Sequence, residues 1–188
     1  MPNDALLLKR LRSGEQRAFA ELLDRFGPRI QSLARRYAVS IADAEDLTQE
    51  IFVDLFQSVA TFRGEAQLST WIYRVALNHC LRWREKQTRE TARCGPQCEG
   101  ENEPSRDAFG DPQRRAAQSD LQREVAGALD ALSDLHREIV ILHELHGLSY
   151  AQCAEILQIP LGTVKSRLSN AFSQLRVALG SYVLGDTP

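Results

Sequence analysis

Apolar residues recur at helical spacing along most of the chain, whereas the strict alternation that is typical of β-strands never lasts. The clearest example lies in residues 15–40. Its apolar positions follow one another at steps of three or four residues: Phe19, Leu22, Phe26, Ile30 and Leu33. Positions at this spacing share one face of an α-helix, which can then pack against a core. The pattern therefore predicts an all-α fold.

The same periodicity predicts four helices in the first half of the chain. They cover residues 4–13, 15–40, 41–62 and 67–90. Gly14 is expected to close the first helix, and Gly27–Pro28 is expected to kink the second because proline removes a backbone donor. Asp43 is expected to cap the third helix, and the fourth is expected to start near Ser69.

The composition changes abruptly after the fourth predicted helix. Residues 93–113 contain three prolines, three glycines and almost no apolar residue, which is typical of a flexible linker. Helical patterns resume at residue 119 and continue almost to the end of the chain. We therefore expect two small helical domains, residues 1–92 and 119–188, joined by a flexible linker over residues 93–118.

Two amphipathic patterns near the C-terminus flank a break at residues 159–162. The first begins at Ser149 and the second at Thr163. The second repeats apolar residues at helical spacing: Val164, Leu168, Phe172 or Ala171, Leu175 and Leu179. Lys165 and Arg167 then face outward. Such a pair of helices predicts a helix–turn–helix, whose second helix fits the major groove of DNA. The alternative is a helical hairpin whose basic face is merely solvated.

Composition narrows the classes of protein to which the chain can belong. Hydrophobic residues make up 43% and charged residues 26%, and no apolar run approaches the roughly 18 residues of a membrane span. The first residues show no secretory signal pattern. We therefore expect a cytoplasmic protein without membrane insertion. Four cysteines in 188 residues do not make a disulfide scaffold, so reduced thiols are expected.

The net charge of −2 hides local clusters of basic residues. Residues 1–93 hold 15 Lys and Arg against 12 Asp and Glu. Residues 160–182 hold three cationic side chains and no acidic one. Because the positive charge is local, it suits contact with nucleic acid better than the overall balance suggests.

Two motifs in the N-terminal half indicate different partners. Residues 43–56, DAEDLTQEIFVDLF, present an acidic face that suits a basic protein better than DNA. Residues 61–86 interleave Trp71 and Tyr73 with arginines, which suits single-stranded DNA because bases stack on rings and phosphates pair with cations. The alternative interpretation is that both aromatic residues belong to the core and the arginines only aid solubility.

Taken together, these motifs resemble those of the bacterial sigma-70 family. Residues 43–56 resemble region 2.2, residues 62–78 (FRGEAQLSTWIYRVALN) resemble regions 2.3 and 2.4, and residues 132–168 resemble region 4. The short length, with regions 1.1 and 3 missing, resembles the extracytoplasmic function (ECF) group. The resemblance implies a region 2 helical bundle in the first domain and a region 4 helix–turn–helix in the second.

The resemblance also implies a function and a set of site residues. The chain would be a non-enzymatic sigma factor that directs promoter-specific transcription initiation under the control of an anti-sigma factor. Its partners would be the β′ clamp helices and the β subunit of core RNA polymerase, and promoter DNA in duplex and single-stranded form. The residues implied to dock on the β′ clamp helices are Asp46, Leu47, Gln49, Glu50, Phe52 and Leu55. Those implied to open and read the −10 element are Phe62, Arg63, Gly64, Trp71, Arg74, Asn78 and Arg82. Those implied to hold the −35 duplex are Thr163, Lys165, Ser166 and Arg167.

The chain departs from the family pattern directly after Leu168. Family members often continue with HRAR or a similar run, whereas this chain has SNAF at residues 169–172. Two cationic contacts are therefore missing, and we expect a weaker −35 affinity or a different sequence preference. The salt dependence of binding should flatten by about one unit for each lost phosphate contact.

Other functions have less support in the sequence. No Gly-rich phosphate loop or Ser-His-Asp set is evident, so neither an enzyme nor a cofactor is expected. A helix–turn–helix regulator acting on duplex DNA alone is an alternative, but it leaves the two N-terminal motifs without a role. Thiolate and imidazole suit zinc, so a metal or redox sensor remains a hypothesis. Its candidate residues are His79, Cys80, Cys94, Cys98, His136, His143 and His146. The favoured interpretation is that they are ordinary core, loop and surface residues.

Overall fold

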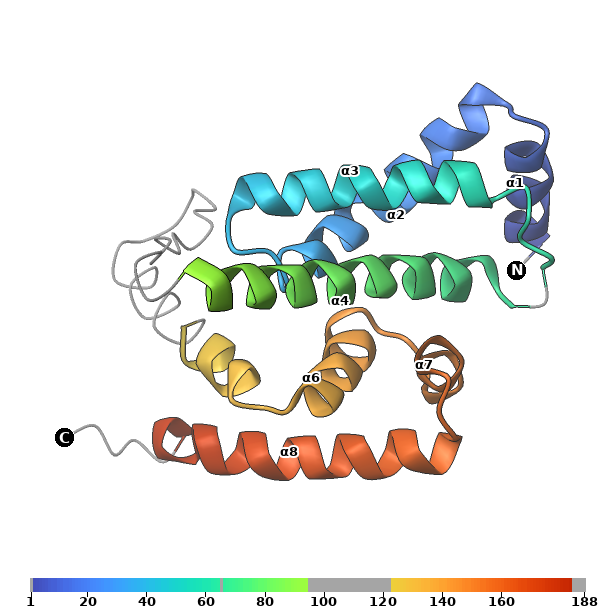
Figure 1. Ribbon diagram of the computed structural model, residues 1–188. Coiled ribbons are helices and arrows are strands. Elements are labelled where there is room, and N and C mark those ends of the chain that lie inside the picture. Colours follow the sequence, from blue (N-terminus) through green and yellow to red (C-terminus); the bar gives the residue numbers. More distant parts are fainter. Residues whose placement is uncertain (1, 65, 95–122, 184–188) are drawn as a thin grey trace, which may run out of the picture. The chain divides into compact units, whose positions relative to one another are not determined.

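The computed structural model describes residues 2–64, 66–94 and 123–183, with side chains over 4–64, 66–90 and 123–180 (Figure 1). Among these residues every regular element is a helix, which confirms the all-α prediction. The chain divides into two compact units, Met1–Ser105 and Arg106–Pro188. Most of the linker predicted at 93–118 lies outside the described residues.

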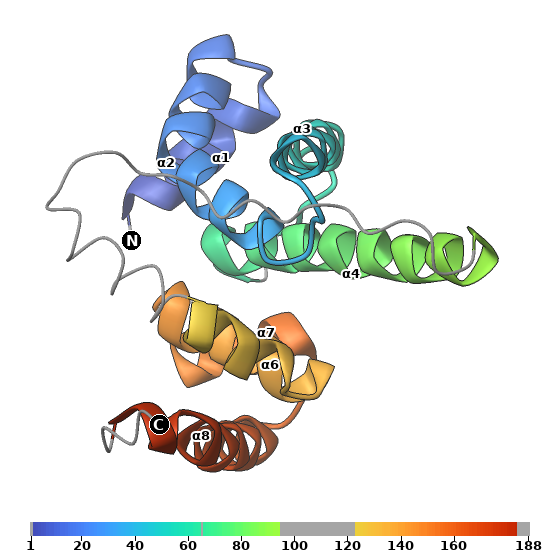
Figure 2. The same ribbon diagram turned by 90° about the vertical axis from the view of Figure 1, so that its left-hand side faces the viewer.

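The first unit contains four labelled helices. They are α1 (Pro2–Arg12), α2 (Gln16–Ala34), α3 (Ile41–Ser58) and α4 (Leu68–Cys94). Helices α2 and α3 pack on each other and on α4, and α1 packs on α2 and α4. Figure 2 views α3 end-on while α4 runs across the view, so the two helices cross (Figure 2). Fully buried apolar side chains from every helix fill the space between them: Leu7, Leu22, Ile30, Leu47, Ile51 and Ile72.

The helix boundaries in this unit differ from the predicted ones in two places. Ser40, not Asp43, caps α3: the Ser40 hydroxyl accepts from the Asp43 backbone N–H at 3.1 Å, and the Asp43 carboxylate accepts from the Ser40 N–H at 3.1 Å. This reciprocal capping box satisfies two backbone donors at once. Helix α2 runs through Pro28, as predicted, but ends at Ala34 and not at residue 40. Gly14 has a φ of +75°, which a glycine adopts without strain where the chain leaves α1.

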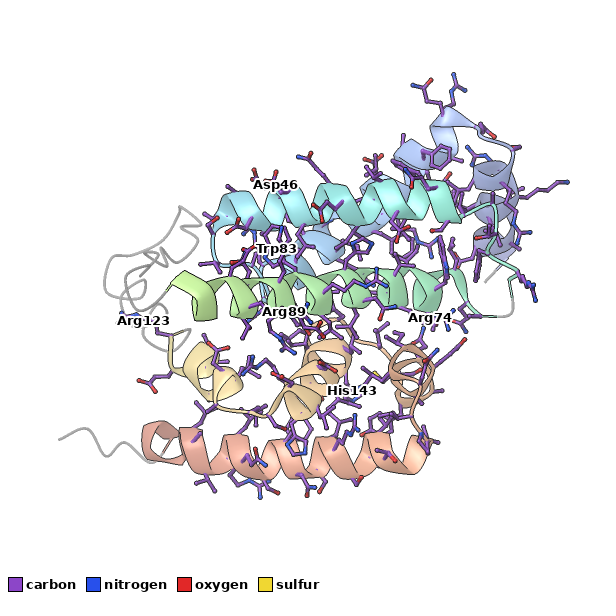
Figure 3. The ribbon with its side chains drawn as sticks, viewed as in Figure 1. Asp46, Arg74, Trp83, Arg89, Arg123 and His143 are labelled. Atoms are coloured by element: carbon purple, nitrogen blue, oxygen red, sulfur yellow. The ribbon has the colours of Figure 1, made fainter. Side chains whose placement is uncertain are left out.

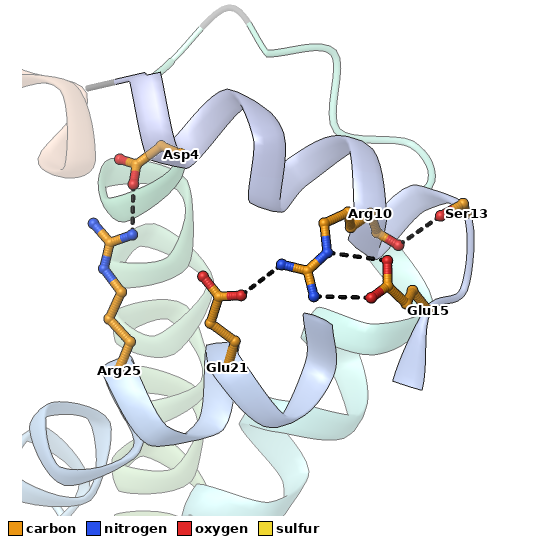
Figure 4. A network of polar contacts seen from close by, with 6 residues as sticks. All are labelled: Asp4, Arg10, Ser13, Glu15, Glu21 and Arg25. Carbon is orange, nitrogen blue, oxygen red and sulfur yellow. Dashed lines mark hydrogen bonds and ion pairs between the residues drawn. The ribbon is translucent and has the colours of Figure 1, made fainter. Parts of the chain in front are cut away.

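Three ion pairs tie α1 and the turn after it to α2 (Figure 4). The Arg10 guanidinium lies 2.7 Å from the Glu21 carboxylate and 2.9 Å from that of Glu15. The Asp4 carboxylate lies 2.6 Å from the Arg25 guanidinium. The hydrogen bond from Arg10 lowers the pKa of Glu15. Exposed pairs contribute little singly, but together they set the position of α1 on α2.

The second unit is built around α8. Residues 123–130 are helical, and α6 (Asp134–Val140), the π-helix η1 (Ile141–Leu145), α7 (Tyr150–Leu157) and α8 (Leu161–Val183) follow. Both α6 and α7 pack on α8. Within the helical pattern predicted from residue 119 onward, α6 thus continues directly into one π-helical turn. The buried core includes Ile139, Ile141, Leu142, Val164 and Leu168.

Helices α7 and α8 form the predicted helix–turn–helix. Ser149 and Gln152 make a capping box at the start of α7, and Gln158 ends that helix in the left-handed conformation with a φ of +53°. Helix α8 begins at Leu161, directly after Pro160, and so two residues before the predicted start at Thr163. The buried stripe of α8 uses Ala171, which is fully buried, whereas Phe172 is 39% exposed.

Candidate nucleic-acid interfaces

One face of α4 gathers most of the residues predicted to read the −10 element. Trp71, Arg74, Asn78 and Arg82 stand at steps of three, four and four residues on one uninterrupted helix, so they share a face. Asn78 and Arg82 are exposed and Arg74 is half-buried. Figure 3 shows Arg74 on the side of α4 turned away from α3 (Figure 3). This face offers an amide and two guanidinium groups to a ligand.

The two aromatic residues of the predicted −10 site pack against each other and are buried. The Phe62 ring stacks on the Trp71 ring with centroids 4.8 Å apart and planes inclined by 22°. Each residue is only 7% exposed. The two rings therefore form the floor beneath the loop between α3 and α4, and stacking of a base on either ring stays a prediction.

The same loop exposes two further residues of the predicted set. Arg63 and Gly64 are both solvent-exposed. Gly64 has a φ of +79°, a conformation that side chains with a Cβ rarely adopt. The loop thus places a guanidinium group and an open stretch of backbone beside the start of α4.

Two further arginines, Arg12 and Arg89, lie outside the predicted set of −10 residues. Arg12 of α1 donates from Nη2 to the main-chain carbonyl of Phe62. No sequence pattern indicates this contact, because the two residues lie 50 positions apart. Arg89 continues the spacing of Arg82 by seven residues, so helical periodicity could have identified it. In the structure Arg89 lies 3.5 Å from Glu85.

The residues predicted to dock on polymerase separate into two groups on α3. Asp46, Gln49 and Glu50 are exposed. Leu47, Phe52 and Leu55 are buried. Residues 41–58 contain five acidic side chains and no Lys or Arg. The outer face of α3 is therefore acidic, and the inner leucines anchor it to the core.

An apolar groove lies between α2 and α3, beside the exposed residues of this set. Its volume is about 460 Å³. It is lined by Leu23, Gly27, Gln31, Thr48, Gln49, Phe52, Val53 and Phe56. Leu23 and Val53 are 41% and 51% exposed, so apolar surface reaches the rim. Asp46, Gln49, Glu50 and Val53 follow helical spacing along α3, which places acidic groups next to the groove.

A polar contact joins the acidic helix to the helix of the predicted −10 face. His79 Nε2 on α4 lies 2.8 Å from Asp54 Oδ2 on α3, within hydrogen-bonding distance. The His79 side chain is 20% exposed. The contact lies one residue after Asn78, so it fixes the rotation of α4 near the middle of the predicted reading face.

Helix α8 presents the residues predicted to hold the −35 duplex. Lys165 and Ser166 are exposed, and Thr163 and Arg167 are half-buried. Within the described part of the chain, no residue pairs with the ammonium of Lys165 or the guanidinium of Arg167. Ser166 donates to the Thr163 carbonyl at 3.1 Å. Buried Val164 on the opposite face holds this surface outward.

Cys80, Cys153 and His143 each have a place in the packing or hydrogen bonding of the fold. Cys80 and Cys153 are buried free thiols, and burial raises the pKa of Cys80 to about 12 and that of Cys153 to about 11. His143 Nδ1 lies 2.7 Å from the Leu148 carbonyl oxygen. Across the described ranges, no group of three or more His, Cys, Asp or Glu side chains could hold a metal ion. Cys98 and the side chain of Cys94 lie outside the described residues.

Two family models match the chain in the order of its two units. The model of Sigma-70 region 2 matches residues 22–90, and the model of Sigma-70, region 4 matches residues 122–175. The first match covers α2 to α4 except their outermost residues, and the second covers α6 to most of α8. Helix α1 lies before the first match.

Relatives extend the similarity over most of the chain. It is 33% identical over 172 residues to the ECF RNA polymerase sigma-E factor of Escherichia coli K12, covering 89% of this chain and 90% of the relative. It is 34% identical over 184 residues to the factor of the same name from Haemophilus influenzae, again covering 89% of this chain and 90% of the relative.

In the helices that the structure describes, none is long and apolar enough to span a membrane.

Two solved structures share the fold. CnrH in complex with the cytosolic domain of CnrY matches with a TM-score of 0.70 and 26% identity, covering 95% of this chain and 97% of that one. The sigma factor RpoE in complex with the anti-sigma factor NepR from Bartonella quintana matches with a TM-score of 0.67 and 26% identity. That match covers 86% of this chain and 96% of the solved one.

Proposed function

The chain belongs to the sigma-70 family, in its extracytoplasmic function group, and on that premise we propose which of its surfaces performs each step of transcription initiation. As a sigma factor it acts with RNA polymerase on promoter DNA and catalyses no reaction itself. The observation that carries the assignment is the match of region 2 and region 4 to separate units. Each unit then engages its own target, and the boundaries 1–92, 93–118 and 119–188 stay a proposal.

The polymerase-binding surface is the outer face of α3 and the groove beside it. Asp46, Gln49 and Glu50 contact the β′ clamp helices directly, while Leu47 and Leu55 hold α3 in place from within the core. Acidic side chains beside an apolar groove suit an amphipathic helix with basic flanks, because opposite charges orient it and apolar burial supplies affinity. Contact with the β subunit is also part of this proposal.

The −10 element is opened and read by the loop before α4 and the outer face of α4. Arg63, Arg74 and Arg82 attract the phosphates of the single strand, and Asn78 offers an amide to an extruded base. This assignment is supported by the arrangement of these residues on one continuous helix face and on the exposed loop before it. Phe62 and Trp71 shape this site from below as a stacked pair.

The −35 element is held as duplex by the first two turns of α8. Arg167 reads a base edge in the major groove, and Thr163, Lys165 and Ser166 contact phosphates. The absence of an internal partner for Lys165 and Arg167 among the described residues supports this role, since their donors remain available. Arg176 lies further along the same helix and is exposed.

We infer control by an anti-sigma factor from the solved structures that share this fold, because both are complexes with a partner. The RpoE match is a complex with the anti-sigma factor NepR, and the CnrH match is a complex with the cytosolic domain of CnrY. A partner that covers the acidic face of α3 or the basic face of α8 blocks polymerase or DNA. A cytoplasmic location accords with this role and remains a proposal.

Run-off transcription with core RNA polymerase tests the function. The template is a promoter that the holoenzyme itself enriches from a library with randomised −10 and −35 regions. We expect the protein to direct initiation at a defined start point from this promoter, and core enzyme alone to show no preference for it. Failure to enrich any promoter, together with failure to bind core enzyme, refutes the proposal and favours a regulator that binds duplex DNA by itself.

A further inference from the structure

The loop between α3 and α4 is held by a residue from outside both helices. Arg12, the last residue of α1, donates from Nη2 to the main-chain carbonyl of Phe62. The backbone N–H groups of Thr61 and Phe62 donate to the carbonyls of Ser58 and Val59, at 3.0 Å and 3.3 Å. The backbone N–H groups in the first half of the loop are therefore held by the C-terminal end of α3, and one of its carbonyls is held by α1.

The helix from which Arg12 projects is anchored both to the core and to α2. Leu7 and Leu11 on α1 are at most 1% exposed. The ion pairs of Asp4 with Arg25 and of Arg10 with Glu21 fasten the two ends of α1 to α2 (Figure 4). A side chain on such a helix holds its target in one place more effectively than one on a mobile segment.

Helix α1 also approaches the loop on the other side of Arg63. A Cβ built on Gly64 would lie 3.9 Å from Leu8 Cδ2. Arg63 is thus flanked by Phe62, whose carbonyl is bonded to Arg12, and by Gly64, whose Cα faces Leu8. Helix α1 is consequently bonded to the backbone on one side of Arg63 and lies near it on the other side.

We propose that α1 clamps the loop that reads the −10 element, with Arg12 as the positioning residue. This inference rests on the proposed function of the loop. By holding the Phe62 carbonyl, Arg12 fixes the direction in which Arg63 and the neighbouring peptide groups project toward the DNA strand. Helix α1 precedes the region 2 match, which begins at residue 22, so this role is additional to what that match covers.

Amide hydrogen exchange of the full-length protein tests the clamp without DNA or polymerase. We expect the Thr61 and Phe62 amides to exchange about three- to tenfold faster in Arg12→Ala, the change that the loss of one hydrogen bond produces. Arg12→Lys, which keeps a cationic donor, should recover part of the protection. Lys9→Ala removes the same charge from an exposed position on α1 and should change nothing. Unaltered exchange in Arg12→Ala overturns the clamp.

Promoter discrimination tests the consequence for −10 reading. Holoenzyme with each variant transcribes the enriched promoter and derivatives substituted in the −10 element. For Arg12→Ala we expect the preference for the enriched sequence to fall about three- to tenfold, with unchanged affinity for core polymerase. Arg12→Lys should restore part of this preference, and Lys9→Ala should match the unmodified protein.

Three outcomes overturn the positioning role. A uniform loss on all −10 sequences, with a salt slope lower by about one unit, makes Arg12 a phosphate contact instead. A parallel loss of core affinity in both Arg12 variants indicates unfolding of the whole unit. If Arg63→Ala leaves discrimination intact while Arg12→Ala still speeds exchange, the clamp exists but the loop does not read the −10 element, and the proposed function of the loop fails.

Discussion

At the scale of single residues, the structure separates cations that serve the fold from cations that remain available to a ligand. Arg137 donates to the carbonyls of Leu129 and Leu132 at 2.9 Å and 3.1 Å, so its guanidinium group closes the turn before α6. Arg167 has no such partner among the described residues and lies on the outward side of α8. An arginine in that position can donate two hydrogen bonds to the edge of one guanine.

Arg167→Ala should relax the −35 preference. Loss of a bidentate base contact costs about 1–3 kcal/mol at one position and leaves the other positions unchanged. Binding of the holoenzyme to the enriched −35 duplex and to its single-base derivatives, at fixed salt, measures this difference.

Arg176→Ala is the matched control, because it removes the same charge from an exposed position about two and a half turns further along α8. It should leave the −35 preference as it is. If Arg167→Ala weakens binding equally for every sequence, Arg167 contacts phosphate and reads no base.

At the scale of elements, the short first helix of the helix–turn–helix depends on its cap. Helix α7 has eight residues, a length at which an isolated helix is not stable in water. The Ser149 hydroxyl accepts from the Gln152 N–H at 3.3 Å, and the Gln152 side chain accepts from the Ser149 N–H at 2.9 Å. Buried Cys153 and Ile156 then fasten the helix to the unit. Cap and core together hold α7 against α8.

Ser149→Ala should lower the free energy of unfolding of the second unit by about 1 kcal/mol, because it leaves a helix N-terminal donor without its acceptor. Chemical denaturation of the full-length chain, followed by circular dichroism, measures this change. Both tryptophans, Trp71 and Trp83, lie in the first unit, so the fluorescence transition should stay where it is.

Ser173→Ala provides the control for the cap. This serine is exposed within α8 and donates to the Ser169 carbonyl of its own helix. Alanine is the better helix former at such a position, so stability should change by less than about 0.5 kcal/mol. Equal losses in the two variants would show that the Ser149 cap has no special role.

At the scale of the whole molecule, the proposed targets are divided between two separately folded units. The acidic face of α3 belongs to Met1–Ser105, and the basic face of α8 belongs to Arg106–Pro188. This division explains how a chain with a net charge of −2 can act on DNA. In the proposed assignment, one surface attracts polymerase and others attract the phosphates, so neither interaction requires the whole chain to be basic.

Asp46→Arg should weaken the affinity for core RNA polymerase at least about tenfold, because it places a cation on an acidic docking face. Binding of the full-length protein to the enriched −35 duplex should not weaken, because that surface lies on the other unit. A core-binding titration and a duplex-binding titration of the same preparation measure the two effects.

Glu155→Arg makes the same change of charge at an exposed position on α7 and should leave core affinity unaltered. If Asp46→Arg binds core enzyme as tightly as the unmodified protein does, the docking assignment on α3 is wrong. If both variants lose affinity equally, net charge rather than a particular face governs the association.

The sequence by itself determined the helices, their approximate positions and the faces that they present. These features depend on spacing along one element, so Lys165 and Arg167 could be assigned to the outward face of their helix before any partner was known. The small errors were local as well. The cap of α3 lay at Ser40 because Asp43 serves as its partner in the capping box, and α8 began at Leu161 because Pro160 is compatible with a helix start.

Only the tertiary structure decided which of the assigned residues are accessible and what positions them. Leu47 and Leu55 turned inward because α2 and α4 cover that side of α3. The stacking of Phe62 on Trp71 and the bond from Arg12 to the Phe62 carbonyl join different segments of the unit. Such contacts leave no periodic signal along the chain, because they arise when separate elements pack and their side chains meet in space.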